Sequence, residues 1–165
     1  MKLRIAGVVR ESVVDGPGIR YVIFAQGCLH RCPGCHNQHT WDLESGEEVS
    51  VEYLLADVFR NPLLSGVTFS GGEPFLQAGA FACLGEEVKR RGLSVVTYTG
   101  YTFEELMALD LKPIRRLLEV TDILVDGPFR LELKDPTLPF RGSSNQRLID
   151  VPRSMREGRV VTVEV

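Results

Sequence analysis

Three cysteines in a single eight-residue stretch could hold a metal centre. Cys28, Cys32 and Cys35 follow a C-x3-C-x2-C pattern in the segment GCLHRCPGC. Three thiolates on so short a loop can bind one face of a cubane iron–sulfur cluster and leave its fourth iron without a protein ligand. An open coordination position distinguishes catalytic metal centres from structural ones. The spacing therefore favours a catalytic [4Fe–4S] cluster on these three thiols.

A zinc site is the alternative that the spacing by itself leaves open. A histidine such as His30, His36 or His39 would have to supply the fourth ligand. Zinc fingers and ribbons usually pair two cysteine clips that lie far apart, and the one remaining cysteine is Cys83. Cys83 falls on the expected buried side of a helix, where a small core residue is the simplest interpretation.

The segments around the cysteines are predicted to alternate between strand and helix. Apolar, β-branched runs predict strands over 20–26, 66–70, 93–98 and 123–126, followed by final strands over 147–151 and 159–165. Amphipathic spacing predicts helices over 50–60, 77–91 and 113–120, with a further short helix that begins at the capping box of Thr102 and Glu105. Alternation of this kind predicts parallel strands joined by crossover helices, hence an α/β sheet.

Each notable motif follows the end of a predicted strand. The cysteines follow the first strand, Gly71-Gly72-Glu73 the second, Thr99-Gly100 the third and Asp126-Gly127 the fourth. Ligands of α/β folds bind beyond the carboxyl ends of the strands. The two glycines would let the backbone approach a ligand closely. We therefore expect one active site at this edge of the sheet.

The composition describes an ordinary globular chain. With 165 residues, 44% hydrophobic content and a net charge of -3, it predicts a single domain over 1–165 and gives no support for nucleic-acid or membrane binding. The N-terminus lacks the features of a signal peptide and no run of apolar residues is long enough to span a membrane, which predicts a cytoplasmic protein. Residues 127–146 are rich in Pro, Gly, Ser and Arg and predict a long functional loop.

Together these motifs give the chain a resemblance to a known family. The cysteine pattern and the GGEP segment at 71–74 resemble the radical S-adenosylmethionine superfamily. VDGPGIR at 14–20, with HN and TW after the cysteines, resembles the glycyl-radical activating enzymes. LVDGPF at 124–129 and FRGSSNQR at 140–147 are most similar to the activating proteins of anaerobic ribonucleoside-triphosphate reductase.

The resemblance implies a fold, a reaction and a set of site residues. The fold is a single-domain incomplete parallel β/α barrel, and the cofactors are a [4Fe–4S] cluster and S-adenosylmethionine. Reductive cleavage of S-adenosylmethionine would give a radical that takes hydrogen from a glycine of the anaerobic reductase, with electrons from a donor such as flavodoxin or ferredoxin. The cofactor-binding positions it implies are Gly34, Cys35, His36, Asn37, Gly71, Gly72, Glu73, Thr99 and Asp126.

The sequence also departs from some relatives, and other functions stay open. Pyruvate formate-lyase activating enzymes carry a Lys where this chain has Pro128 and an Asp near Thr97 that it lacks, so their cation site is not expected. One alternative is the activating enzyme of another glycyl-radical enzyme, and a second is an enzyme like 7-carboxy-7-deazaguanine synthase. A non-catalytic zinc-binding module that docks through its arginines is the alternative from a different class.

Overall fold

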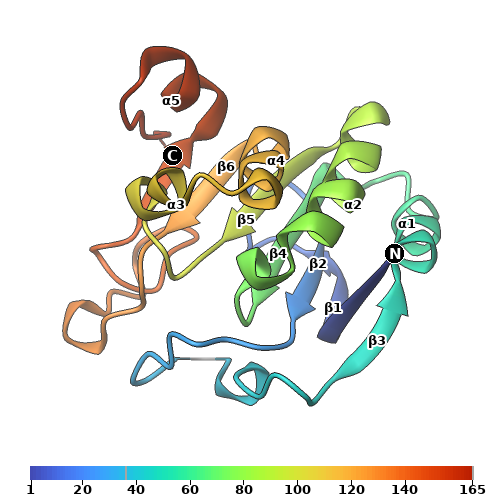
Figure 1. Cartoon of the computed structure of the whole chain (residues 1–165), viewed down its shortest axis with the longest axis horizontal. Helices are drawn as coiled ribbons and strands as arrows, with labels where there is room; N and C mark the ends of the chain where they lie inside the picture. Colours follow the sequence, from blue (N-terminus) through green and yellow to red (C-terminus); the bar gives the residue numbers. More distant parts are fainter. Residues whose placement is uncertain (36, 165) are drawn as a thin grey trace.

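The computed structural model describes residues 1–35 and 37–164, and within them the chain forms one seven-stranded sheet (Figure 1). The strand order is β3-β1-β2-β4-β5-β6-β7. The strands are β1 (Lys2–Ser12), β2 (Arg20–Ala25), β3 (Glu47–Ser50), β4 (Gly66–Gly71), β5 (Ser94–Tyr98), β6 (Ile123–Asp126) and β7 (Arg147–Asp150). The central strands β2, β4, β5 and β6 run parallel, which confirms the predicted α/β sheet. The outer strands β1, β3 and β7 pair antiparallel, so the sheet is mixed.

The helices begin where local capping chemistry allows. They are α1 (Val51–Val58), α2 (Ala78–Arg90), α3 (Phe103–Leu109), α4 (Lys112–Val120) and α5 (Val151–Glu157), with short 3-10 turns at Gln38–Thr40, Pro74–Gln77 and Leu131–Leu133. The Ser50 side chain accepts from the Tyr53 amide at the start of α1. The predicted capping box of Thr102 and Glu105 is present at the start of α3. These caps satisfy amides that the first turn of a helix leaves free.

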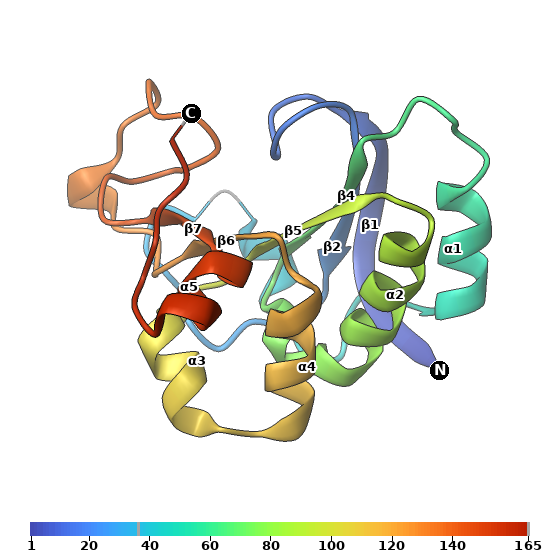
Figure 2. The same cartoon turned by 90° about the horizontal axis from the view of Figure 1, so that it is seen from above.

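Helices α1 to α4 cover one face of the sheet, as the view from above shows (Figure 2). The core forms between them, and the rings of Phe69 on β4 and Phe81 on α2 lie 4.7 Å apart between centroids. Leu84 on α2 and Leu117 on α4 are fully buried in the same cluster. Burial of each such side chain stabilises the fold by about 1.5–3 kcal/mol. This apolar layer holds the parallel strands in place from behind.

The opposite face of the sheet is covered by loops instead of helices (Figure 2). A smaller apolar cluster of Val96, Val125 and Leu148 lies there, with Tyr98 and Phe140 packed against it. The Tyr98 hydroxyl donates to the Phe140 carbonyl at 2.7 Å and so ties the loop between β6 and β7 to β5. This face contains the cavity described below.

Arg20 fixes the segment that leads into β2. Its side chain is 1% exposed and donates to the Thr68 hydroxyl at 2.8 Å, to the Val67 carbonyl at 2.8 Å and to the Pro17 carbonyl at 2.9 Å. Burial lowers the pKa of this guanidinium to about 10. The arginine of the VDGPGIR motif therefore holds the turn at Pro17 against β4.

The structure differs from the sequence prediction mainly at one edge of the sheet and at the C-terminal end of the chain. Strands β1 and β3 and helix α5 were not expected. The strand predicted over 159–165 is wrong for the described residues, because Thr162 makes only an isolated bridge to Ile149. In the described part of the chain, no helix has the length and apolarity needed to cross a membrane.

Candidate active site

A cavity of about 910 Å³ lies beyond the carboxyl ends of β2, β4 and β5. Its volume falls in the range of ligand sites, which is about 300–1,000 Å³. The structure brings these predicted site residues together on its wall: Cys28, Cys32, Cys35, Asn37, Gly71, Gly72 and Thr99. The predicted placement of one active site at this edge of the sheet therefore matches the cavity.

The cysteine loop is tied to the segment that follows it. The Gly27 amide donates to the Thr40 carbonyl at 2.6 Å, and the Cys28 amide donates to the Trp41 carbonyl at 3.2 Å. Within the loop, the Cys35 amide donates to the Cys32 carbonyl at 3.1 Å. These bonds close the loop on itself, so its three thiols face one cavity.

The buried environment of two of the cysteine thiols favours their protonated form. Burial raises the pKa of the Cys28 thiol, which is 8% exposed, and also that of the Cys32 thiol. The thiolate is the form that binds iron, so cluster assembly must displace protons from these sulfurs.

The donor set fits a cubane cluster. Over residues 1–35 and 37–164, no three His, Cys, Asp or Glu side chains gather closely enough to hold a single metal ion. A cubane does not need that arrangement, because each thiolate binds a different iron and the sulfurs stand further apart. Three thiols on one cavity wall, with space beyond them, suit a cluster with an open iron.

The glycine pair at the end of β4 packs against the end of β2. Gly71 has a φ of +86°, and a Cβ there would lie 2.7 Å from the Cα of Phe24. A Cβ on Gly72 would lie 2.3 Å from the Gly27 carbonyl oxygen. Both positions need glycine because a Cβ would collide with the backbone at the end of β2. Both residues also line the cavity.

Glu73 does not line the cavity and is surrounded by a buried set of donors. The carboxylate is 1% exposed and accepts from the His30 ring at 2.6 Å and from the Thr99 hydroxyl at 2.9 and 3.0 Å. It also accepts from the amides of Gly100 at 2.9 Å and Phe75 at 3.1 Å. The hydrogen bond that His30 donates to Glu73 raises the pKa of His30.

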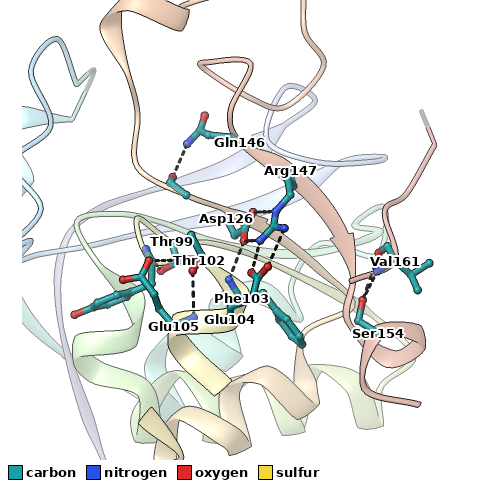
Figure 3. A network of polar contacts seen from close by, with 12 residues as sticks. Thr99, Thr102, Phe103, Glu104, Glu105, Asp126, Gln146, Arg147, Ser154 and Val161 are labelled. Atoms are coloured by element: carbon teal, nitrogen blue, oxygen red, sulfur yellow. Dashed lines mark hydrogen bonds and ion pairs between the residues drawn. The ribbon is translucent and has the colours of Figure 1, made fainter. Parts of the chain in front are cut away.

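Asp126, another predicted site residue, is held in a buried ion network (Figure 3). It is 1% exposed and accepts from Arg147 at 3.0 and 2.6 Å and from the Phe103 amide at 2.8 Å. Arg147 also binds Glu104 at 2.5 Å, and these bonds raise its pKa. Asp126 therefore joins β6, α3 and β7, and Arg147 is half-buried in this network.

The polar residues of the RGSSNQR segment hold the loop between β6 and β7. The Gln146 side chain accepts from the Gly142 and Ser143 amides at 2.9 and 3.2 Å and donates to the Gly127 carbonyl at 3.1 Å. Asn145 donates to the Pro128 carbonyl at 2.8 Å. This internal bonding fixes the loop as a wall of the cavity.

The remaining predicted positions differ in their placement. Gly34 has a φ of +77°, and a Cβ there would meet the side chain of Leu131 at 2.9 Å, so it packs against the loop between β6 and β7. The Asn37 carbonyl accepts from the Thr40 hydroxyl at 2.5 Å. His36 lies outside the described residues. Cys83 on α2 is half-buried and accepts from Arg116 at 3.5 Å.

Several cavity residues were missed at the level of sequence. Phe24, Ser70 and Tyr98 line it from the ends of three neighbouring strands, and Phe24 pairs with Ser70 in register. The alternation of side chains along a strand places these residues on the face opposite the helices. This two-residue alternation is the sequence signal that could have identified them as cavity residues. Arg141 also lines the cavity from the loop, and its Nε is buried with no partner among the described residues.

Known proteins share these features. Residues 14–149 match the family model of the 4Fe-4S single cluster domain. The anaerobic ribonucleoside-triphosphate reductase-activating protein of Salmonella typhimurium is 36% identical over 143 residues, covering 82% of this chain and 90% of that protein. This chain belongs to the family of anaerobic ribonucleoside-triphosphate reductase-activating proteins. As a member of that family it is a radical enzyme of the oxidoreductase class, with a [4Fe–4S] cluster and S-adenosylmethionine as its cofactors.

One further relative and one solved structure have other names. The pyruvate formate-lyase 1-activating enzyme of Escherichia coli is 42% identical over 159 residues, covering 90% of this chain and 61% of that protein. The crystal structure of QueE from Escherichia coli aligns with a TM-score of 0.49 at 25% identity, covering 62% of this chain and 54% of that one.

Proposed function

We propose that this protein activates an anaerobic ribonucleoside-triphosphate reductase by generating a glycyl radical on it. One observation carries the proposal: three thiols at the end of β2 face a cavity of about 910 Å³ at the carboxyl ends of the parallel strands. The family to which the chain belongs names the reductase as the protein that its members activate. The reductase is therefore the expected substrate.

We assign the cluster to Cys28, Cys32 and Cys35. We assign S-adenosylmethionine to the cavity beyond them, against the backbone of Gly71 and Gly72. Asn37 and Thr99 line the same wall, while Gly34 and His36 flank the third thiol. Asp126 shapes the site through Arg147 instead of by contact, because its oxygens are already bonded.

Cys28, Cys32 and Cys35 would hold the cluster, which when bound would supply the electron for cleavage of S-adenosylmethionine and so the radical chemistry at the target glycine. The protein's own part is to bind, orient and protect. Phe24, Tyr98 and Phe140 give the cavity apolar walls that displace water from the reacting groups. The loop between β6 and β7 closes one side, and its bonded RGSSNQR segment keeps that wall in place.

We further propose that residues 1–165 act as one radical domain whose sheet is an incomplete barrel. Four parallel strands, helices on one face and a cavity on the other support this arrangement. A cytoplasmic location fits the four cysteines, which are all free of disulfides. A small reductant such as flavodoxin or ferredoxin is the proposed electron donor.

The test is to reconstitute the chain anaerobically with iron and sulfide, then reduce it with S-adenosylmethionine present. We expect release of 5′-deoxyadenosine, and a glycyl radical signal in electron paramagnetic resonance when the reductase is added. A full cluster with no 5′-deoxyadenosine would overturn the enzyme assignment. Zinc uptake with no such product would support the non-catalytic module.

A second candidate target is pyruvate formate-lyase, because its activating enzyme in Escherichia coli is 42% identical to this chain. Pro128 stands where those enzymes carry a lysine, which favours the reductase. The same resonance experiment, run with each target protein in turn, separates the two. A signal with pyruvate formate-lyase alone would reverse the assignment.

A further inference from the structure

Glu73 has no capacity left to bind a cofactor directly. A carboxylate accepts about four hydrogen bonds. Here four groups donate to it: the His30 ring, the Thr99 hydroxyl and the amides of Gly100 and Phe75. The side chain is 1% exposed. An ammonium group of a ligand would have to displace one of these donors to reach it.

The His30 ring also packs against the segment that follows β5, and its remaining side lines the cavity. A Cβ on Gly100 would lie 2.5 to 2.8 Å from three ring atoms, so the missing side chain makes room for the imidazole. The Tyr101 ring meets the His30 ring edge-on, with centroids 4.6 Å apart. The His30 side chain is 18% exposed. His30 is thus held by the segment that follows β5, although it belongs to the cysteine loop.

The contact joins three strand ends. His30 lies between Cys28 and Cys32, Glu73 follows β4, and Thr99 and Gly100 follow β5. A hydrogen bond between an imidazole and an ionised carboxylate is stronger than one between neutral groups. Because the donor lies inside the cysteine loop, this bond ties the middle of the loop to the ends of β4 and β5.

We propose that Glu73 and His30 form a latch that positions the cysteine loop, and that Glu73 acts through His30 instead of contacting S-adenosylmethionine. Both are positioning residues. The inference rests on the proposed function only in taking the loop as the cluster site. The latch itself is a property of the chain before any cluster binds.

The first test measures amide hydrogen exchange of the loop peptide in the full chain, before and after reconstitution. His30→Ala removes the latch and should speed exchange about tenfold, as expected for loss of one charge-assisted hydrogen bond. His30→Gln keeps a donor near the same place and should restore slow exchange. Gly100→Ala displaces the ring without altering either partner and should act like His30→Ala. His39→Ala is the matched control, because His39 is an exposed histidine of the neighbouring segment.

The second test records electron paramagnetic resonance of the reduced, reconstituted variants while S-adenosylmethionine is titrated. We expect His30→Ala still to bind iron, but to give a broadened signal because its cysteine loop is looser. It should need about tenfold more S-adenosylmethionine than the wild type for the same spectral change. His30→Gln should recover the wild-type spectrum.

Wild-type exchange rates in His30→Ala, or equal effects of His30→Gln and His30→Ala, would overturn the latch. Failure of the wild-type chain to take up iron would instead overturn the proposed function, and the exchange data from the cluster-free chain would still decide the latch.

Discussion

Replacing Arg147 with methionine should destabilise the protein, because it leaves the Asp126 carboxylate buried with one donor. Asp126 is 1% exposed and would lose two N–H donors, at 3.0 and 2.6 Å, and keep only the Phe103 amide. Removing one partner of a fully buried ion pair costs about 3–5 kcal/mol. The Arg147 side chain is 32% exposed, so water can replace part of the interaction. We therefore expect a loss of about 2–3 kcal/mol in unfolding free energy.

The assay is denaturant unfolding of the full chain without cluster, under anaerobic reducing conditions, followed by circular dichroism. Asp126→Asn should by itself cost about 1–2 kcal/mol. The double variant should cost less than the sum of the two by at least about 1 kcal/mol, because the second change then removes an interaction that is already lost. Arg153→Met is the matched control, since Arg153 is 53% exposed and pairs with Glu157 on α5. It should cost under about 0.5 kcal/mol.

The same variant should loosen the loop between β6 and β7, because Arg147 and Asp126 stand at its two ends. Trypsin should cut Arg147→Met faster than the wild type at Arg130, Lys134 or Arg141. A loss below about 1 kcal/mol, or strict additivity with Asp126→Asn, would refute the idea that this buried pair holds the loop.

Three further predictions concern the thiols, the core and the glycine pair. Cys32→Ala should lose the cluster while Cys83→Ala keeps it, as measured by iron content. Tyr21→Phe should be less stable at pH 8, because the Tyr21 hydroxyl donates to the buried Asp57 at 2.6 Å. Gly72→Ala should lose about 1–3 kcal/mol or more, because its Cβ would lie 2.3 Å from a backbone oxygen.

The Tyr21 prediction has a definite pH window. Burial raises the pKa of Tyr21 above its usual value of 10.0, so the folded state keeps the proton after the unfolded state has lost it. Its contribution is fully present below pH 10 and falls as the pH rises beyond that. The stability difference between wild type and Tyr21→Phe, measured by denaturant midpoints from pH 8 to 11, should therefore shrink above pH 10.

Three results would contradict these expectations. Equal iron loss from Cys32→Ala and Cys83→Ala would contradict the ligand assignment. A pH-independent difference for Tyr21→Phe would contradict the buried hydroxyl. Wild-type stability of Gly72→Ala would contradict the close approach of β4 to the cysteine loop.

Local sequence signals were enough for the central sheet and for the centre of the site. The apolar runs of β2, β4, β5 and β6 are buried on both faces, so their strand character is visible in composition alone. The Thr102 and Glu105 capping box is decided within four residues. The spacing of the three cysteines is also a local signal, and the resemblance to the family rests in part on it.

The outer parts of the fold depend on partners that are distant in sequence. β1 carries exposed and polar residues and forms because β2 and β3 pair with its two edges. The segment 159–164 has strand-like composition, but within the described residues its strand pairing is limited to the isolated bridge of Thr162 to Ile149. Hydrogen bonds along an edge depend on neighbouring strands, so composition alone missed β1 and wrongly predicted a strand over 159–165.

Local sequence was sufficient to place three thiols and a glycine pair after the ends of parallel strands, because loop spacing and strand periodicity are local properties. The roles of the acidic residues became clear from the folded chain alone. Glu73 meets His30 across 43 positions, and Asp126 meets Arg147 across 21. The order of the strands brings these partners together. A carboxylate's role depends on which donors surround it, and those donors come from other elements of the fold.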